Sequence, residues 1–169
     1  MTSNRAKSRR RLRAAVLIAS DRAATGVRPD ETRALLVGPL ADIGIDVAAE
    51  GTVPDDRKTI ASRLKEWSGA GIDLILVSGG TGISPTDVTP EATLDVIDKR
   101  IPGIEEAMRH ASMTITPYAM LSRAVAGISG STLIINLPGK PTAAVENLSV
   151  VAPVLSHAIE LIRGGDPHE

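Results

Sequence analysis

Three short apolar runs constrain the fold of this 169-residue chain more than any other feature of its sequence. They are AAVLIA at 14–19, IDLILV at 72–77 and TLIINL at 132–137. Short runs with few polar positions are typical of strands covered on both faces, as in a parallel sheet, whereas a half-exposed strand alternates apolar and polar residues. The three runs therefore predict the central strands of a sheet that lies between two layers of helices.

Segments with helical periodicity separate these strands. We expect helices at 30–43, 57–68, 90–98, 103–112 and 142–163. Thr89 is placed to cap the third helix with Pro90 at its first position, and Pro153 is expected to kink the last helix. A less clearly patterned strand is expected at 45–53. This alternation of strand and helix predicts an α/β domain with three layers, α/β/α.

One segment departs from the parallel pattern. AVAGISGSTLII, at 124–135, contains two strand-like runs on either side of Ser129-Gly130, a pair that is typical of a tight hairpin turn. The two strands of a hairpin run antiparallel to each other. We therefore expect 123–128 to form one antiparallel strand beside 132–137, in a sheet that is otherwise mostly parallel.

The composition excludes several classes of protein. Cysteine is absent, which excludes disulfides and thiolate metal sites and is compatible with the reducing cytoplasm. The formal net charge is -1, and Trp67 and Tyr118 are the only aromatic residues, so no base-stacking surface for nucleic acid is expected. No run approaches the roughly 18–20 apolar residues of a membrane span. We expect a cytoplasmic protein with neither a nucleic-acid nor a membrane partner.

The N-terminal segment differs from the rest of the chain in its charge. Residues 1–12 are rich in arginine and lysine and poor in apolar residues, so we expect a disordered basic tail. The apolar run that follows is short for a signal peptide, and no clean cleavage site comes after it. Residues 13–169 have the length of one domain and contain no visible repeat, which predicts a single domain.

Small and polar residues follow each of the three apolar strands. In open α/β sheets, ligands bind outside the carboxyl ends of the strands, so three such loops at one edge predict a binding site. The candidate residues in these loops are Ser20, Asp21, Ser78, Gly79, Gly80, Thr81, Gly82, Asn136, Pro138 and Gly139.

The glycine loop GGTG, at 79–82, would lie at the centre of this edge. Without Cβ atoms, its N–H groups can approach an anion such as a phosphate closely. The motif matches neither G-x-x-x-x-G-K-[ST] nor G-x-G-x-x-G, which excludes two common nucleotide-binding loops. Taken alone, it is more typical of a tight turn that binds nothing.

Two aspartates are candidate ligands for a metal ion. Asp87 lies between two prolines ahead of the predicted helix at 90–98, and Asp55 follows the expected strand at 45–53. Mg²⁺ takes oxygen ligands, and one or two carboxylates beside substrate phosphates are common. A carboxylate before a helix also favours the helix dipole, and Pro-Asp-Asp suits a turn. The residues alone therefore leave a structural role open for both aspartates.

Several motifs together resemble one family. SGGTG, PTDVTPEAT, IPGIEEAMR, TPYAMLSRAVAGI and STLIINLPGKP are similar, in order and spacing, to the molybdopterin adenylyltransferases, which include the bacterial Mog and MoaB proteins and the G domain of gephyrin. The resemblance extends from residue 13 to about residue 164. It implies the α/β/α fold of a molybdenum cofactor biosynthesis protein. It also implies Mg²⁺-dependent transfer of AMP from ATP to the terminal phosphate of molybdopterin, with release of pyrophosphate.

The resemblance implies roles for individual residues and for partners. Asp55 and Asp87 match the two essential aspartates of the family, which implies that they are catalytic and bind Mg²⁺ directly or through water. Ser112 and Ser122 match its nucleotide and pterin site, together with the glycine loop and NLPG. A homotrimer is implied, with an interface that we expect near 103–121, and so is delivery of the product to a molybdate-inserting protein of the MoeA type. The intact DVTPEAT, VPDD and NLPG motifs favour an enzyme over the alternative, a non-catalytic molybdopterin carrier or scaffold.

Overall fold

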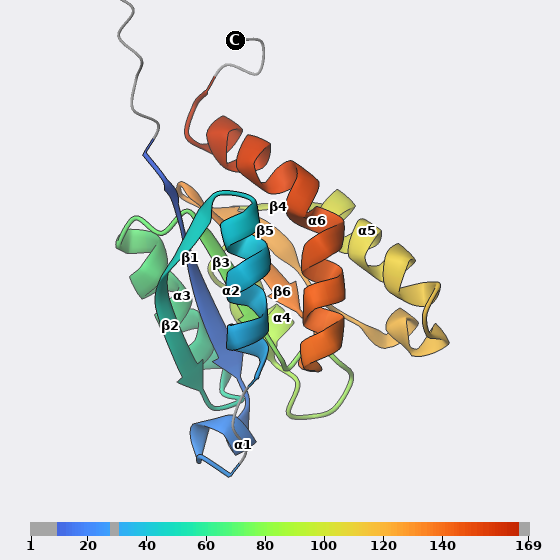
Figure 1. Ribbon diagram of the computed structural model, residues 1–169. Coiled ribbons are helices and arrows are strands. Elements are labelled where there is room, and N and C mark those ends of the chain that lie inside the picture. Colours follow the sequence, from blue (N-terminus) through green and yellow to red (C-terminus); the bar gives the residue numbers. More distant parts are fainter. Residues whose placement is uncertain (1–9, 28–30, 166–169) are drawn as a thin grey trace, which may run out of the picture.

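A computed structural model of the protein describes residues 10–27 and 31–165. These residues form a six-stranded sheet with helices on both sides (Figure 1). The strands are β1 (Leu12–Ala19), β2 (Ile45–Val53), β3 (Leu74–Ser78), β4 (Lys99–Arg100), β5 (Ala126–Ser129) and β6 (Thr132–Leu137). The helices are α1 (Asp21–Ala24), α2 (Thr32–Asp42), α3 (Arg57–Gly69), α4 (Thr89–Leu94), α5 (Pro102–Met113) and α6 (Pro141–Ile162), with a 3-10 helix η1 (Pro117–Leu121).

The order of strands in the sheet is β2-β1-β3-β6-β5-β4. Neighbours among the first four strands pair in parallel, whereas β5 pairs antiparallel with both β6 and β4. Among the described strands, β5 is thus the one that runs against the others. The predicted fold class, a mostly parallel sheet with one antiparallel strand between layers of helices, is confirmed.

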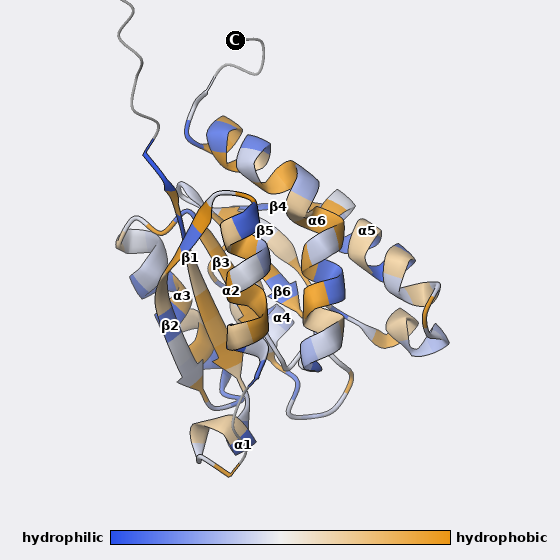
Figure 2. Cartoon of the chain, in the orientation of Figure 1, coloured by the Kyte–Doolittle hydropathy of each residue, from blue (hydrophilic) through white to orange (hydrophobic). Residues whose placement is uncertain are grey.

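The core has two apolar layers, because successive side chains of a strand point to opposite faces of the sheet. Val16 and Leu76 pack on the face covered by α2, α5 and α6, whereas Leu17 and Ile75 pack on the face covered by α3 and α4. All four side chains are fully buried. Hydrophobic residues accordingly dominate the central strands in Figure 2. Burial on both faces explains why these strands are continuously apolar in the sequence.

The antiparallel strand begins later than the sequence predicts, at Ala126 rather than at residue 123. The side chain of Asn136 on β6 accepts a hydrogen bond from the Val125 N–H (3.1 Å) and so occupies a position that a backbone carbonyl would take in a regular ladder. The hairpin turn also lies one residue further on than expected, at Gly130-Ser131, where Gly130 has a φ of 57°. A positive φ at the first turn position is the conformation that favours glycine.

The prediction that Thr89 caps the third helix is wrong. Val88 is the N-cap of α4, no side chain caps the helix, and Pro90 lies in its first turn. Thr89 is instead the first helical residue and is fully buried. Its hydroxyl group is therefore available for interactions with the loops at the carboxyl edge of the sheet.

The same helix also ends four residues before the predicted boundary at residue 98. The Asp98 N–H donates to the Ile128 carbonyl (2.7 Å), and the next two residues pair with β5 as the short edge strand β4. Sheet pairing at the edge therefore replaces the last predicted helical turn.

α6 spans the predicted range and changes direction part-way along (Figure 1), as expected from its internal Pro153. Within the described chain, it is the helix that is long and apolar enough by length and composition to be a candidate membrane span. Its apolar side, which includes Leu148, Val151, Leu155 and Ile159, is buried in the core against the sheet. Packing within the domain thus accounts for the apolar residues on this side of the helix.

The N-terminal boundary of the fold lies slightly before the predicted one. β1 begins at Leu12, and Arg10 donates to the buried carboxylate of Asp73 at 3.2 Å. Arg11 lies 3.3 Å from the carboxylate of Asp46. Residues 10–12 therefore contact the domain, and residues 1–9 of the predicted tail lie outside the described residues.

Candidate active site

Two cavities open where the loops after β1, β3 and β6 meet. The first has a volume of about 590 Å³ and is also bordered by the N-terminal ends of α2 and α6. The second has a volume of about 270 Å³ and lies between the glycine loop, α5, η1 and the first turns of α6. Gly80 lines the first cavity, whereas Thr81 and Gly82 line the second. The two cavities therefore share the glycine loop as a common wall.

Close contacts between loop backbones explain the glycines at this edge. Gly79 has a φ of 102°, and a Cβ atom there would lie 2.3 Å from the Ala19 carbonyl oxygen. A Cβ atom on Gly139 would lie 3.2 Å from the Cα atom of Gly79. The ends of β1, β3 and β6 can approach this closely only because side chains are absent.

Two buried oxygen atoms converge on Gly80, which has a φ of 62°. A Cβ atom on Gly80 would lie 2.5 Å from Thr89 Oγ1 and 3.2 Å from Asp55 Oδ1. Among the described residues, neither oxygen has a hydrogen-bond partner. Buried polar atoms in native proteins are nearly always satisfied, so unpartnered atoms beside a cavity indicate a place for a ligand, a water molecule or an ion.

Asp55 is held by a reciprocal pair of hydrogen bonds with Asp21. The Asp21 N–H donates to Asp55 Oδ2 (3.0 Å), and the Asp55 N–H donates to Asp21 Oδ1 (2.9 Å). Burial raises the pKa of Asp55, and the negative charges of Asp21 and Asp87 raise it further. The hydrogen bond from the Asp21 amide lowers this pKa but does not cancel the rise. No positive charge is among the causes that lower the pKa of Asp55, so its ionised carboxylate favours the approach of a cation.

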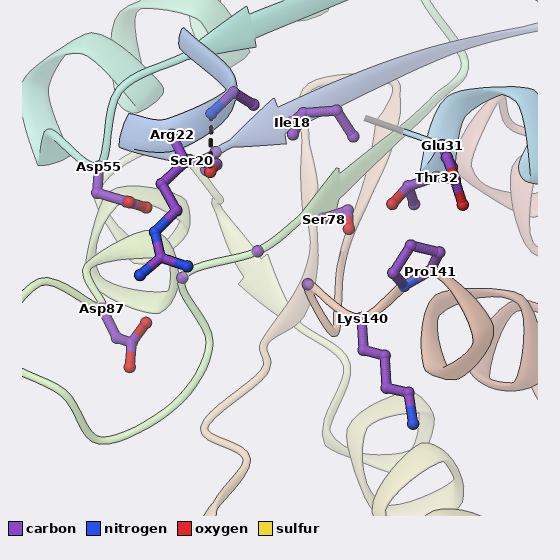
Figure 3. Close-up of a pocket in the computed structure, with 15 residues that line it drawn as sticks. Ile18, Ser20, Arg22, Glu31, Thr32, Asp55, Ser78, Asp87, Lys140 and Pro141 are labelled. Atoms are coloured by element: carbon purple, nitrogen blue, oxygen red, sulfur yellow. Dashed lines mark hydrogen bonds between the residues drawn. The ribbon is translucent and has the colours of Figure 1, made fainter. Parts of the chain in front are cut away.

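Asp87 lines the same cavity as Asp55 and lies on the same side of it (Figure 3). Its Oδ2 atom accepts a hydrogen bond from the Ser84 N–H (2.8 Å), and its own N–H donates to the Ser84 carbonyl (2.9 Å). A Cβ atom on Gly82 would lie 2.8 Å from Asp87 Oδ2. Local turn bonds thus fold the carboxylate back against the loop.

The residues of the first cavity fit Mg²⁺ that arrives with phosphates. Among the residues that the structure describes, no group of three or more His, Cys, Asp or Glu is arranged to hold a metal ion. Asp55 and Asp87 supply two carboxylates at one cavity, and Asp55 Oδ1 is unpartnered. One or two carboxylates, with water and substrate phosphates completing the shell, are a common environment for Mg²⁺.

The first cavity also contains basic residues that sequence reasoning missed. Arg22 points towards the side of the cavity that bears Asp55 and Asp87, and Lys140 extends from the opposite side (Figure 3). Both residues are adjacent in sequence to motif residues, so their charge was a usable signal for a phosphate site. Thr32 and Glu31, at the start of α2, also line this cavity. They are not adjacent in sequence to any motif residue, so nothing in the sequence indicated this position.

Several predicted residues line the first cavity while serving the fold. Ser20 caps α1 by accepting a hydrogen bond from the Ala23 N–H (3.2 Å). The Ser78 hydroxyl donates to the Pro138 carbonyl (2.8 Å) and so joins the ends of β3 and β6. These hydroxyl groups thus position the loops that surround the cavity.

Ser112 and Ser122, with Pro138, line the second cavity. The Asn147 amide, which sequence reasoning missed, donates to the Ser112 hydroxyl (3.0 Å) and to the Ala143 carbonyl (2.9 Å). Arg109, also missed, donates to the Ala124 carbonyl (3.1 Å) and faces the same cavity. Tyr118, Ala119 and Leu121 add an apolar wall.

Asn136 and Asp21 line neither cavity. Asn136 is fully buried, and its amide donates to Thr93 Oγ1 (2.8 Å). Asp21 fixes the orientation of Asp55 through the reciprocal hydrogen bonds described above. Both predicted site residues therefore support neighbouring parts of the site in this structure.

The sheet order, the glycine loop and the paired cavities define an α/β domain whose site lies at the carboxyl edge of a mostly parallel sheet. The chain belongs to the family described as the probable molybdopterin binding domain, which matches residues 15–157. The family predicted from the sequence motifs is therefore confirmed.

Known proteins of this family are similar over most of the chain. Gephyrin from Dictyostelium discoideum is 42% identical over 158 residues, which cover 87% of this chain but only 22% of gephyrin. Molybdopterin adenylyltransferase from Helicobacter pylori strain J99 is 40% identical over 152 residues, or 88% of this chain and 86% of that protein. The crystal structure of the molybdopterin biosynthesis enzyme MoaB from Thermus thermophilus has a TM-score of 0.86 and 45% identity, with coverage of 90% of this chain and 97% of that one.

Proposed function

We propose that this protein transfers AMP from ATP to the terminal phosphate of molybdopterin, with release of pyrophosphate, in molybdenum cofactor biosynthesis. The observation that carries the proposal is the pair of cavities that meet at the glycine loop, one charged and the other largely apolar. A reaction between two substrates needs two adjoining sites. The similarity to a protein named molybdopterin adenylyltransferase over 88% of the chain supports the same activity.

ATP phosphates suit the first cavity. Asp55 and Asp87 would hold Mg²⁺, which supplies neutralisation of the triphosphate charge when bound. Arg22 and Lys140 line this cavity and can pair with phosphate oxygens. The N–H groups at the start of α6, next to Lys140, also favour an anion.

Molybdopterin suits the second cavity. Its ring system needs hydrogen-bonding groups as well as an apolar surface, and Ser112, Ser122 and Asn147 offer the former. Tyr118 and Leu121 offer the latter. A ligand in this cavity could direct its terminal phosphate towards the shared glycine loop.

The protein's part in such a reaction is to position the substrates and to balance their charge. The terminal phosphate attacks the α-phosphorus of ATP, the bond to pyrophosphate breaks, and no side-chain nucleophile is required. Holding two reactants in the correct geometry can alone supply a large part of the rate enhancement. The backbone of the glycine loop, which lines both cavities, and the cations of the first cavity suit that task.

Pyrophosphate release is the direct test of the proposed function. The purified protein should release pyrophosphate from ATP in the presence of Mg²⁺ and molybdopterin, and should release none when molybdopterin is omitted. Molybdopterin binding without pyrophosphate release would contradict an enzymatic role and would favour the alternative, a non-catalytic carrier or scaffold.

We also propose a homotrimer that hands its product to a molybdate-inserting protein of the MoeA type in the cytoplasm. In the segment expected at the interface, Met108 is buried in the subunit's own core, whereas Ile115, Tyr118 and Met120 are at least 64% exposed. An apolar surface of this kind favours a subunit contact at 113–121. Light scattering should give about three times the chain mass of 17.6 kDa. A monomer mass would contradict both the trimer and this interface.

A further inference from the structure

Arg123 makes a set of hydrogen bonds that the proposed function leaves unexplained. Its Nε atom donates to the Gly82 carbonyl (2.6 Å), and its Nη2 atom donates to the Asp87 carbonyl (2.7 Å). Its Nη1 atom pairs with the carboxylate of Glu91 on α4. The backbone N–H of Arg123 also donates to the Thr81 carbonyl (2.8 Å). One residue thus contacts both ends of the loop that carries Asp87.

The guanidinium group is well suited to fix this loop. It is planar, it presents its donors in a rigid arrangement, and it remains charged at every relevant pH. Gly82 and Asp87 are bound by the same group, so residues 82–87 are closed into a ring. The hydrogen bond from the Ser84 N–H then orients the Asp87 carboxylate within this ring. Without Arg123, the carbonyls of Gly82 and Asp87 would be deprived of these donors.

The contacts of Arg123 rest on a rigid base. Two residues further on, Val125 exchanges hydrogen bonds with Asn136: the Asn136 N–H donates to the Val125 carbonyl (2.9 Å), and the Val125 N–H donates to Asn136 Oδ1 (3.1 Å). Asn136 is fully buried and also donates to Thr93 of α4 (2.8 Å). Arg123 is therefore anchored to both β6 and α4.

The partner of Arg123 on α4 is ionised and partly buried. Burial by itself raises the pKa of Glu91, but the hydrogen bond and charge of Arg123 outweigh it and leave the pKa below its usual value. The other carboxylate oxygen of Glu91, Oε2, is buried and has no partner among the described residues. The interaction with Arg123 is thus the main compensation for this charge.

Arg123 also binds residues that line both cavities. Gly82 and the neighbouring Ser122 line the second cavity, whereas Asp87 lines the first. A change in the hydrogen bonds of Arg123 would alter the wall that the two cavities share. One of the two carboxylates of the first cavity would then no longer be held in a fixed position.

We propose that Arg123 is a positioning residue that holds the loop of residues 82–87 so that Asp87 meets the magnesium-bound phosphates in a productive geometry. Its expected effect on turnover rests on the proposed function. Its expected effect on the order of the loop does not.

The test compares Arg123→Gln and Arg123→Lys with a matched control, Arg57→Gln. Arg57 also binds the end of α4, through two hydrogen bonds of 2.7 Å to the C-cap residue Asp95, but none of its described hydrogen bonds reaches residues 82–87. Lysine can keep a charge beside Glu91 but cannot reproduce the planar arrangement that binds both carbonyls. Arg123→Lys should therefore recover stability more fully than it recovers turnover.

Two readouts separate positioning from a general loss of structure. Arg123→Gln should lower kcat by about 10²-fold, because a displacement of about 1 Å is enough for such a loss. The KM for molybdopterin should change by less than about threefold, since Arg123 acts by binding the loop and not by binding that substrate. Hydrogen exchange of peptides covering 82–88 should be faster in Arg123→Gln than in the wild type, and unchanged in Arg57→Gln.

The proposal is overturned if the exchange of 82–88 in Arg123→Gln equals that in Arg57→Gln. It is also overturned if kcat falls equally in these two variants. If the wild type releases no pyrophosphate, the proposed function fails, and hydrogen exchange alone then decides the role of Arg123: faster exchange supports it, and equal exchange rejects it.

Discussion

Two carboxylates of this protein have opposite environments. Glu105 on α5 is 1% exposed, and Arg100 donates to both of its oxygens, at 2.7 and 2.8 Å. The Ala126 N–H adds a further hydrogen bond of 3.1 Å. Asp55 at the carboxyl edge of the sheet receives one backbone hydrogen bond on Oδ2, while its buried Oδ1 has no partner among the described residues.

Their pKa values shift in opposite directions as a result. Burial by itself raises the pKa of Glu105, but the hydrogen bonds from Arg100 and Ala126 and the charge of Arg100 outweigh it and lower the pKa. Burial also raises the pKa of Asp55, and there the nearby charges, from Asp21 and Asp87, raise it further. A carboxylate that the fold has already satisfied is structural. One that is left without a cation, beside a cavity, is suited to a ligand that brings the cation with it.

The largest effect is expected from removing the acidic groups of the first cavity. Asp87→Ala and Asp55→Ala should each lower the turnover of pyrophosphate release by a factor of about 10²–10³ or more, because each would remove a group that stabilises charge in the transition state. Circular dichroism should show that both variants remain folded. Wild-type turnover in both variants at saturating Mg²⁺ would refute these roles.

Glu105→Gln should act on stability. Removing one partner of a buried ion pair typically costs about 3–5 kcal/mol, and we expect about 3 kcal/mol here, because Arg100 is half exposed and can be resolvated. Urea unfolding at neutral pH would measure this loss. A stability within about 1 kcal/mol of the wild type, as is usual for exposed pairs, would show that the network around Glu105 contributes little.

The stability that Glu105 contributes should depend on pH. Because its pKa is lowered in the folded state, the contribution is fully present above the ordinary value of 4.5 and is lost as the pH falls through the lowered folded pKa. The difference in the free energy of unfolding between the wild type and Glu105→Gln should therefore become smaller as the pH falls below 4.5. A difference that stays constant over this range would contradict the charge-based explanation.

Gly80→Ala tests the close approach that brings Asp55 Oδ1 and Thr89 Oγ1 together. The added Cβ atom would lie 2.5 Å from Thr89 Oγ1, at a backbone φ of 62° that disfavours alanine. Because it would displace Thr89 Oγ1 and Asp55 Oδ1, the added Cβ atom should weaken the binding of Mg²⁺-ATP roughly tenfold or more, equivalent to at least about 1.4 kcal/mol. Gly103→Ala is the matched control, because a Cβ atom there would meet nothing within 4 Å. Equal affinities of the two variants would mean that the glycine loop is a tight turn and does not contact the ligand.

The smallest effect is expected for Asp55→Asn. It should raise the stability of the protein at neutral pH, whereas Glu105→Gln should lower it. Because the folded state raises the pKa of Asp55, ionisation of this group costs stability at neutral pH, and the cost disappears as the pH falls below the ordinary value of 3.8. Asp55→Asn should thus be slightly more stable than the ligand-free wild type at neutral pH, by less than about 1 kcal/mol given solvent screening. The gain should vanish in acid. A loss of stability at neutral pH would mean that Asp55 supports the fold.

The apolar runs predicted the central strands because burial on both faces of the sheet leaves a direct mark on the sequence. The convergence of Asp55, Asp87 and the glycine loop followed from the rule that parallel strands end at one edge. The side-chain contacts of Arg123 were beyond sequence reasoning, since they join residues that lie 32 to 41 positions apart in the chain. For Asn136, the sequence showed a polar residue within an apolar strand but did not show what its side chain binds. The partners of this side chain come from α4 and from the segment before β5.

Calorimetric titration with Mg²⁺-ATP tests most directly the claim that Asp55 is left unsatisfied for a ligand. The wild type, Asp55→Asn and Glu105→Gln would be titrated in parallel under conditions in which all three are folded. We predict that Asp55→Asn weakens binding by about tenfold or more, equivalent to at least about 1.4 kcal/mol, whereas Glu105→Gln binds like the wild type. Equal affinity of Asp55→Asn and the wild type would contradict this claim.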